Sequence, residues 1–338
     1  MSNSRFFHHD PQSSSLLRIL PQALLILALF FGVAEAGSYT GKRVLWVESY
    51  HEGFVWSDGV ARGVEKILAD TGVDLRVVRM DTKRNPSARH AELAGEEALR
   101  VFKEFAPHVV MASEDNAQRY FVVPYLKGGD MPVVASGINW DASEYGYPAP
   151  NVTGMVEVNL LGQARGMLRK FAQGGRFGYV AADSESERKN LEIYNARDFQ
   201  GRLQGHLVSR FGDFLTVFKR VQTQSDMLIM GGNGGIEGWD DEAARNFLQN
   251  HTRIPTGSFD DYLAPYVIFT FAKDPEEQGE WMARTALRVL DGESPAAIPM
   301  AENRRVKLIV NLKLARAAGL VLPVSLLKTA TIIGREEQ

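Results

Sequence analysis

Polar and aromatic side chains follow each of six short apolar runs in this 338-residue chain. Hydroxyls, amides, carboxylates and rings together suit a small polar ligand that carries an ammonium group and an aromatic part. Any one of these segments could equally be a turn or a helix cap, so the inference rests on all six. In chain order they are Glu48-Ser49-Tyr50-His51, Ser113-Glu114-Asp115-Asn116, Ser136-Gly137-Ile138-Asn139-Trp140, Ala182-Asp183-Ser184, Gly231-Gly232-Asn233-Gly234-Gly235 and Phe259-Asp260-Asp261-Tyr262.

Ten residues of these segments and their surroundings are predicted to bind the ligand. The ring of Tyr50 could stack on a planar or cationic group. The amides of Asn116 and Asn139 could orient a carboxylate or an amide of the ligand. The acids could neutralise an ammonium group, which is costly to bury unpaired. The ten residues are Ser49, Tyr50, Trp56, Glu114, Asp115, Asn116, Asn139, Asp183, Asn233 and Asp260.

Signals for catalysis are weak. The pairs Glu114-Asp115 and Asp260-Asp261 could supply the two carboxylates of a glycosidase, but adjacent acids are also typical of helix starts. No histidine or acidic cluster has metal-ligand spacing, and no nucleophile elbow is present. We therefore predict a protein that is not an enzyme, with no catalytic residue, no cofactor and no metal site. An exported hydrolase remains the alternative.

The glycine-rich segment 231–235 follows an apolar run, as a phosphate-binding loop would. It departs from the dinucleotide pattern because Glu237 stands where the third glycine belongs. No Gly-Lys-Ser or Gly-Lys-Thr follows it either. We interpret these glycines as a tight turn that brings backbone N–H groups close to a ligand or to another part of the protein.

Short apolar runs alternate with helical patterns along most of the chain. The alternation runs from residue 43 to 135 and again from 160 to 258, with a turn-rich segment, 145–151, between the two units. Such alternation predicts an α/β protein with parallel sheets and helices on both faces of each sheet. Ligands bind at the carboxyl ends of strands in such sheets, and the six polar segments are expected there.

The two units predict two Rossmann-like lobes. After the second unit come a helix over 275–291, a strand over 306–310 and a helix over 312–318. These elements could return to each lobe in turn, which predicts several hinge crossovers between the lobes. We assign residues 37–154 plus about 268–300 to the N-terminal lobe, and residues 155–267 plus about 301–338 to the C-terminal lobe.

The start of the chain predicts export. An apolar run over residues 23–34 follows a leader with two arginines and ends in Ala34-Glu35-Ala36, so residues 1–36 have the layout of a signal peptide. An uncleaved anchor is the alternative, because the leader is long. With no cysteine, the mature protein has neither a disulfide nor a thiol for a lipid anchor. The net charge of −3 gives no reason to expect nucleic acid. We expect a periplasmic monomer.

Several short motifs, in their order and spacing, support a family resemblance. They resemble motifs of the extracytoplasmic substrate-binding proteins of ABC transporters. The motifs are Trp56-Ser57-Asp58-Gly59, Glu114-Asp115-Asn116-Ala117 and others over 44–51, 132–139, 151–155, 264–266, 276–279 and 310–320. The resemblance implies the type I periplasmic-binding-protein fold, with two lobes, three hinge strands and a small-molecule ligand in the cleft. It also implies a membrane permease as partner. Because the family includes receptor sensor domains, a ligand-binding sensor subunit is a second possibility.

Overall fold

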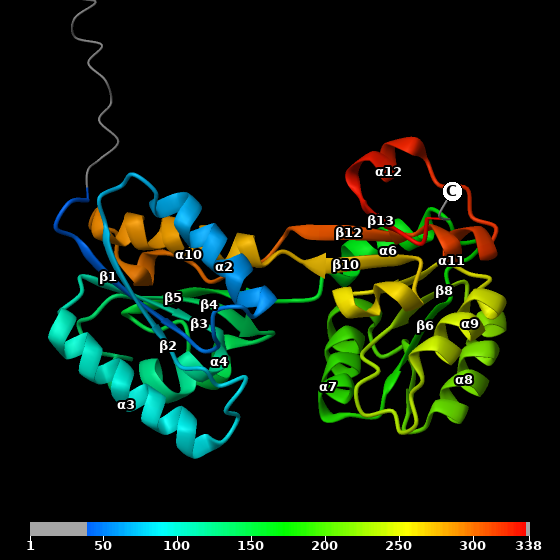
Figure 1. Ribbon diagram of the computed structural model, residues 1–338, viewed down its shortest axis with the longest axis horizontal. Helices are drawn as coiled ribbons and strands as arrows, with labels where there is room; N and C mark the ends of the chain where they lie inside the picture. The colour runs from blue at the N-terminus through cyan, green and yellow to red at the C-terminus, as the bar shows by residue number, and fades with distance from the viewer. Residues whose placement is uncertain (1–38, 336–338) are drawn as a thin grey trace, which may run out of the picture.

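The structure, a computed structural model, describes residues 39–335, and the predicted signal peptide lies outside them. Two lobes lie side by side, and each is a mainly parallel sheet covered by helices on both faces (Figure 1). The predicted α/β class and the two-lobed architecture are therefore confirmed. Within the described residues, no helix is long and apolar enough to cross a membrane.

The first sheet is parallel throughout, in the order β11-β5-β4-β3-β1-β2. Its strands are β1 (Arg43–Glu48), β2 (Asp74–Arg79), β3 (Val109–Ser113), β4 (Val133–Asn139), β5 (Val152–Glu157) and β11 (Ala301–Glu302). Its helices are α2 (Val55–Leu68), α3 (Ala88–Phe105), α4 (Glu114–Ala117), η1 (Gln118–Val122), α5 (Val123–Tyr125), η2 (Ala142–Tyr145), α10 (Pro275–Leu290) and η5 (Pro295–Ala297).

The second sheet has the order β13-β12-β10-β9-β8-β6-β7, and only the β10–β12 pair is antiparallel. Its strands are β6 (Phe177–Ala182), β7 (Gln204–Val208), β8 (Met227–Met230), β9 (Thr256–Ser258), β10 (Phe269–Lys273), β12 (Val306–Asn311) and β13 (Thr331–Ile333). Its helices are α6 (Leu161–Arg169), α7 (Glu185–Tyr194), η3 (Asn195–Phe199), α8 (Phe211–Gln224), α9 (Asp241–His251), η4 (Asp261–Tyr266), α11 (Leu312–Ala317) and α12 (Val324–Thr329).

Apolar strand residues build a core on each face of the first sheet. Leu45 and Phe121 belong to the core beneath α3 and η1, whereas Trp46 and Met282 belong to the core beneath α2 and α10. Strands buried on both faces read as continuous apolar runs, which is why β1 and β3 could be recognised in the sequence. This packing makes the sheet a rigid base for the loops at its carboxyl edge.

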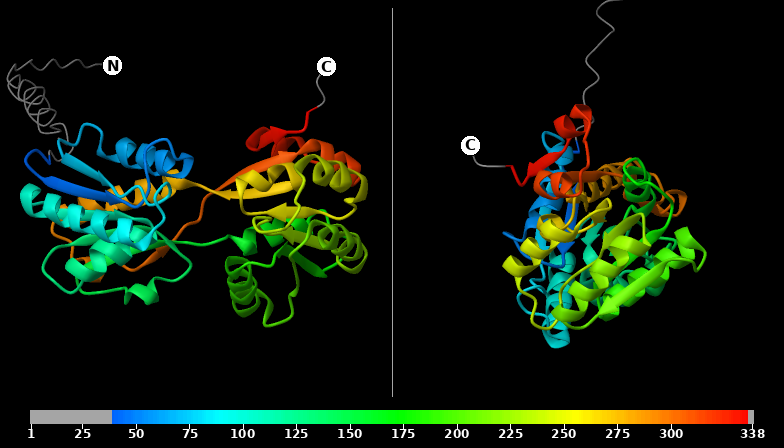
Figure 2. Two further views of the ribbon diagram at one scale, coloured as in Figure 1. Left: turned by 60° about the horizontal axis from the view of Figure 1, so that its bottom comes forward. Right: turned by 90° about the vertical axis from the view of Figure 1, so that its right-hand side faces the viewer.

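Between residues 39 and 335 the chain crosses from one lobe to the other three times (Figure 2). The crossings join β5 to α6, β10 to α10 and β11 to β12. The expected boundary near residue 268 falls before β10, which pairs in the second sheet, so the second crossing comes after Lys273. The expectation missed this because β10 had not been recognised as a strand. Three crossings are the geometry of a hinge.

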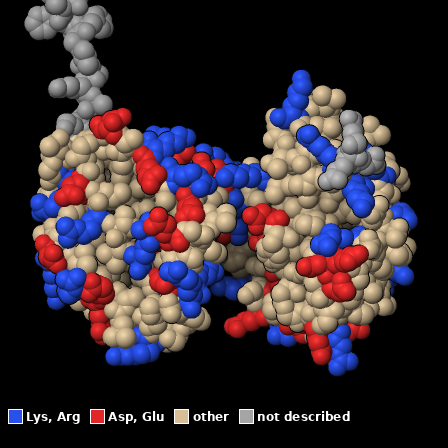
Figure 3. All heavy atoms as spheres, in the orientation of Figure 1, with Lys and Arg blue, Asp and Glu red and all other residues tan. Residues whose placement is uncertain are grey.

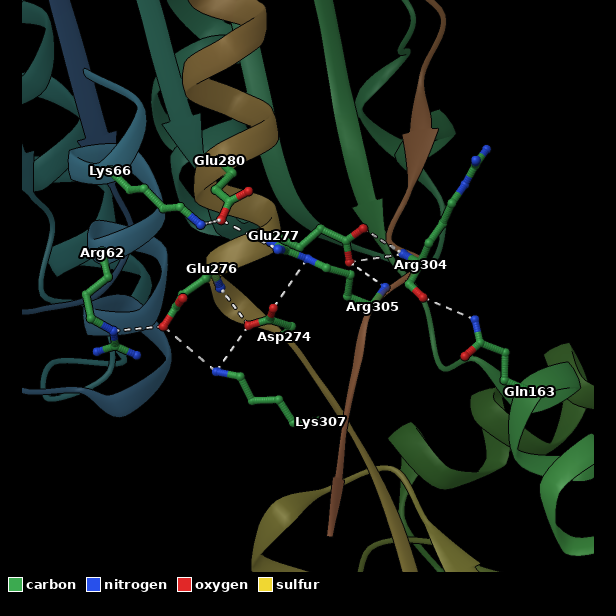
Figure 4. Close-up of polar contacts among 10 residues, drawn as sticks. All are labelled: Arg62, Lys66, Gln163, Asp274, Glu276, Glu277, Glu280, Arg304, Arg305 and Lys307. Carbon is green, nitrogen blue, oxygen red and sulfur yellow. Dashed lines mark hydrogen bonds and ion pairs between the residues drawn. The ribbon is translucent and has the colours of Figure 1, made fainter. Parts of the chain in front are cut away.

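Acidic side chains at the start of α10 hold the third crossing against the second (Figure 4). The Glu277 carboxylate accepts backbone N–H bonds from Arg304 (3.0 Å) and Arg305 (2.7 Å). Asp274 forms ion pairs with Arg305 at 3.3 Å and with Lys307 at 3.1 Å. These contacts join two hinge segments into one unit at the side of the cleft.

Candidate ligand-binding cleft

A hollow separates the two lobes (Figure 3), and a cavity of 500 Å³ lies between them beside the hinge. The first lobe contributes Trp56 and its neighbours at the start of α2. The second contributes residues 259–262, which follow β9, and the end of β10 with Lys273. Apolar and aromatic side chains form much of the wall, and its charged groups are Asp260, Asp261, Arg62, Lys273 and Lys307. Of the ten predicted residues, Trp56 and Asp260 line this cavity directly.

Glu114 is a buried carboxylate at the carboxyl end of β3. Its side chain is 3% exposed, and its Oε1 accepts a hydrogen bond of 2.8 Å from Nε1 of Trp56. Gly137 has a positive φ of 65°, and a Cβ there would overlap the Glu114 carboxylate. Only glycine leaves room for this acid. Burial, with the nearby Glu157 carboxylate, raises the pKa of Glu114 well above its usual value.

The pairing of β3 with β4 brings Asp115 and Asn139 together at the carboxyl edge of the first sheet. Asn139 Nδ2 donates to Asp115 Oδ2 at 2.6 Å, and the Tyr145 hydroxyl donates to Oδ1 at 2.9 Å. Each carboxylate oxygen therefore already has a partner. A ligand at this point would have to add to these bonds or replace them.

Ser49 and Asn116 hold the end of the first sheet together. The Ser49 hydroxyl is buried, donates to the Ser113 carbonyl at 2.7 Å and accepts from the Ala117 N–H at 2.8 Å. Asn116 Nδ2 donates to the Thr82 hydroxyl at 2.8 Å. These contacts position the first turn of α4, and with it Glu114 and Asp115.

Tyr50 is half-buried beside these acids. Its ring lies under the Lys83 ammonium, 4.6 Å from the ring centroid, and packs edge-to-face on Phe54 at 5.3 Å. Burial raises the pKa of its hydroxyl, and the Glu114 carboxylate raises it further. Tyr50 therefore remains a neutral ring and hydrogen-bond donor among the carboxylates.

An ion pair links the two lobes at the hinge. Glu157, at the end of β5 in the first sheet, lies 2.6 Å from Nζ of Lys273, at the end of β10 in the second sheet. Burial acts to lower the pKa of Lys273, but Glu157 and then Asp260 outweigh it, so the pKa is raised. Burial also raises the pKa of Asp260, and Lys273 opposes that rise.

Glu187 explains the glycines after β8. Its Oε1 accepts the N–H of Gly232 at 3.0 Å, and its Oε2 is hydrogen-bonded to the Tyr179 hydroxyl. A Cβ at Gly231 would overlap both Glu187 and Tyr179. The glycines thus allow the loop after β8 to approach Glu187 of α7 closely. Asn233 follows them in a half-buried position.

Asp183 and Trp140 lie at two further strand ends. Asp183 is exposed and pairs with Arg188 of α7 at 2.6 Å. Trp140 reaches across to the second lobe, where its Nε1 donates to Asn190 at 3.0 Å and its ring packs edge-to-face on Tyr194 at 5.7 Å. This side chain forms a direct bridge between the lobes.

The residues that sequence reasoning missed are Glu157, Glu187, Tyr262 and Lys273. Glu157 and Lys273 end strands that had not been assigned, and reading 152–158 and 269–272 as buried strands would have revealed them. Tyr262 was within a polar segment but was not selected. Glu187 lies one turn into α7, where nothing in the sequence distinguishes it from a solvent-facing acid.

The cleft therefore has carboxylates from both lobes, several aromatic rings and four cationic side chains, namely Arg62, Lys83, Lys273 and Lys307. Glu114, Asp115 and Glu157 come from the first lobe, and Glu187 and Asp260 from the second. Between residues 39 and 335, no group of three or more histidine or acidic side chains is placed to hold a metal ion. Charged groups of both signs beside aromatic rings could contact a small polar organic molecule.

No protein-family model matches the chain, and no curated protein matches it. Solved structures do. A ligand-free, open substrate-binding protein with adhesive properties from Clostridium difficile has 15% identity and a TM-score of 0.67, covering 87% of this chain and 100% of its own. An ABC domain in complex with L-Trp from Streptococcus pneumonia has 16% identity and a TM-score of 0.56, covering 86% and 99%. A conserved domain protein from Vibrio cholerae has the same four values.

These similarities show the fold, which is the type I periplasmic-binding-protein fold that the sequence predicts. The predicted resemblance to substrate-binding proteins is thus confirmed at the level of the fold.

Proposed function

We propose that this chain is an exported, periplasmic solute-binding protein that captures an amino-acid-like ligand between its lobes and delivers it to an ABC transporter permease. One observation carries the proposal. Acids from opposite lobes, Glu114 and Asp260, are set among aromatic rings on the two sides of a hinged cleft. Closing such a cleft would enclose a cationic group between two carboxylates and remove it from water.

The side chains suggest an orientation for the ligand. Its ammonium group would lie near Glu114 and Asp260, because a buried charge needs an opposite charge. A planar side chain would lie between Trp56 and Tyr262, which enter the cavity from opposite lobes. A ligand carboxylate would lie near Lys273, the cation at the hinge. Ser49 and Asn116 would support the site from beneath.

The comparisons support this class of ligand without identifying the compound. The Streptococcus protein of the same fold binds L-Trp, an aromatic amino acid with the ammonium, carboxylate and ring described above. The predicted signal peptide and the absence of cysteine support a free protein outside the cytoplasm. A monomer suffices, because both halves of the cleft come from one chain.

A thermal-shift screen of the mature protein against amino acids, peptides, nucleosides and organic acids tests the proposal. A ligand present at about 100 times its dissociation constant should add about 2.7 kcal/mol to the stability of the folded protein. Calorimetry with the best compound should then show one site per chain. If no compound shifts the melting temperature or changes the scattering radius, the proposal is wrong.

Two variants locate the site. Asp260→Asn and Glu114→Gln should each weaken binding by at least about 1.5 kcal/mol, roughly tenfold, if the acid makes a charged hydrogen bond to the ligand. The matched control is Glu96→Gln, because Glu96 is exposed on α3. Equal affinity in all three variants would contradict the assignment of the ammonium site.

A further inference from the structure

A second cavity, of 460 Å³, lies in the second lobe away from the ligand cleft. It is formed at the amino ends of β6 and β7, whereas the cleft lies at the carboxyl ends of the strands. The last turns of α6 and α8 and the segment around η3 complete its walls. Four arginines line it, namely Arg165, Arg169, Arg176 and Arg202.

Two of these guanidinium groups are held in place without being neutralised. Arg165 donates to the backbone carbonyl of Asp198 at 3.1 Å, and its guanidinium lies 5.4 Å from the centroid of the Phe199 ring. Arg202 donates to the Phe199 carbonyl at 3.3 Å and to the side-chain oxygen of Gln200 at 3.2 Å. Carbonyl and amide oxygens fix the geometry of these groups and leave their full positive charge.

The other two arginines differ from each other. Arg176 forms an ion pair with Asp226 at 2.9 Å. Arg169, exposed at the end of α6, has no hydrogen-bond or ion-pair partner among residues 39–335. A cation near a helix C-terminus interacts favourably with the helix dipole, and this accounts for the position of Arg169. The helix dipole does not account for three arginines that line one cavity without an acidic partner.

Most arginines of the described chain are paired with acids, as Arg100 is with Glu97 at 2.7 Å and Arg288 with Glu293 at 2.7 Å. In the second cavity the acid in the lining is Asp198, against four arginines. A chain with a net charge of −3 thus concentrates positive charge in one hollow of its surface. Like charges held close together repel unless an anion lies among them.

We propose that this cavity binds a phosphate group, either free or presented by a phospholipid headgroup. Guanidinium groups match phosphate because their N–H donors form a planar fork that can contact two oxygens at once. Arg165 and Arg169 line the cavity one turn apart on α6, and Arg202 lines it from the segment between η3 and β7, so α6 and this segment would contact different oxygens of one phosphate. The site would work independently of the ligand cleft.

The test uses the mature protein and two probes. Calorimetry with inorganic phosphate measures binding of the free anion. Co-sedimentation with phosphatidylglycerol vesicles measures binding of the lipid headgroup, with phosphatidylcholine vesicles as reference. Binding of either probe supports the proposal and identifies the source. Arg169→Gln combined with Arg202→Gln should weaken binding tenfold or more. Arg284→Gln, an exposed arginine on α10, is the matched control and should bind as the wild type does.

Three results would overturn the proposal: no binding of either probe, unchanged binding in the double variant, or equal loss in Arg284→Gln, which would indicate a general charge effect. Melting temperatures and the response to the cleft ligand show whether the variants are folded. Because those readouts report the cleft, failure of the phosphate site is distinguishable from failure of the proposed solute-binding function.

Discussion

The ion pair between Glu157 and Lys273 offers a direct test of how the lobes are joined. The two charged atoms lie 2.6 Å apart, and the side chains are 8% and 19% exposed. Because one residue ends a strand of each sheet, the pair spans the hinge. Replacing Glu157 with glutamine keeps the shape of the side chain and removes its charge.

The expected loss follows from burial. At 2.6 Å, two unit charges attract by roughly 6 kcal/mol at an effective dielectric constant of about 20, and desolvation of both groups offsets much of this. The variant keeps the desolvation penalty of Lys273 but loses the nearest compensating charge. Removal of one partner of a buried pair costs about 3–5 kcal/mol. We expect about 3 kcal/mol, because Asp260 and Glu114 still attract Lys273.

Urea denaturation of the mature protein measures this loss as a lower midpoint with an unchanged slope. Glu157→Gln combined with Lys273→Met should regain most of the stability, since neither member of the pair is then left buried without the other. Glu293→Gln, which breaks the exposed pair with Arg288, is the matched control and should have a much smaller effect. The reasoning would be refuted if the single variant were as stable as the wild type, or if the double variant were less stable than the single variant.

Two further predictions concern the carboxylate at β3. Burial raises the pKa of Glu114 above 4.5 in the folded protein, so on raising the pH the unfolded chain loses this proton first. The free energy of unfolding should therefore fall as the pH rises from 4.5 through the pKa of Glu114 in the folded protein. Glu114→Gln should flatten that decline in urea denaturation between about pH 5 and 8, and an unchanged slope would contradict it. Gly137→Ala should cost about 1–3 kcal/mol, because alanine is strained at a φ of 65° and would overlap Glu114. Its control, Gly166→Ala in α6, meets open space and should be neutral or stabilising; equal effects would contradict the account.

Sequence patterns predicted most of the fold because buried parallel strands and amphipathic helices leave periodic traces. The helix expected from Pro275 corresponds to α10, with Asp274 as its N-cap. The strands β5 and β10 left weaker traces. Val152–Glu157 follows a turn-rich segment and contains Gly154, and Phe269–Lys273 follows a short 3-10 helix. Both are strands because neighbours pair with them, and that information is tertiary.

The candidate site is likewise predictable from the sequence only in part. Strand ends could be located from sequence, but the meeting of Asp115 and Asn139 depends on the strand order, which the sequence does not show. What their side chains do could not be predicted, because a partner such as Tyr145 is chosen by packing between segments far apart in the chain. Glu187 is the clearest case. Its contact with Gly232 exists only because α7 packs beside β6, the neighbour of β8 in the sheet, and the sequence shows only an acid and a glycine.

The charges of the hinge and of the cleft belong to one electrostatic unit. Glu114, Glu157 and Asp260 all act on Lys273, whose ammonium group pairs with Glu157 across the lobes. Burial, with repulsion from neighbouring carboxylates such as Glu157, keeps the pKa values of Glu114 and Asp260 raised, so ionising both is costly. A ligand ammonium between them would lower that cost in the closed form more than in the open form. In our proposal the same carboxylates therefore select a cationic group and couple its binding to closure of the lobes.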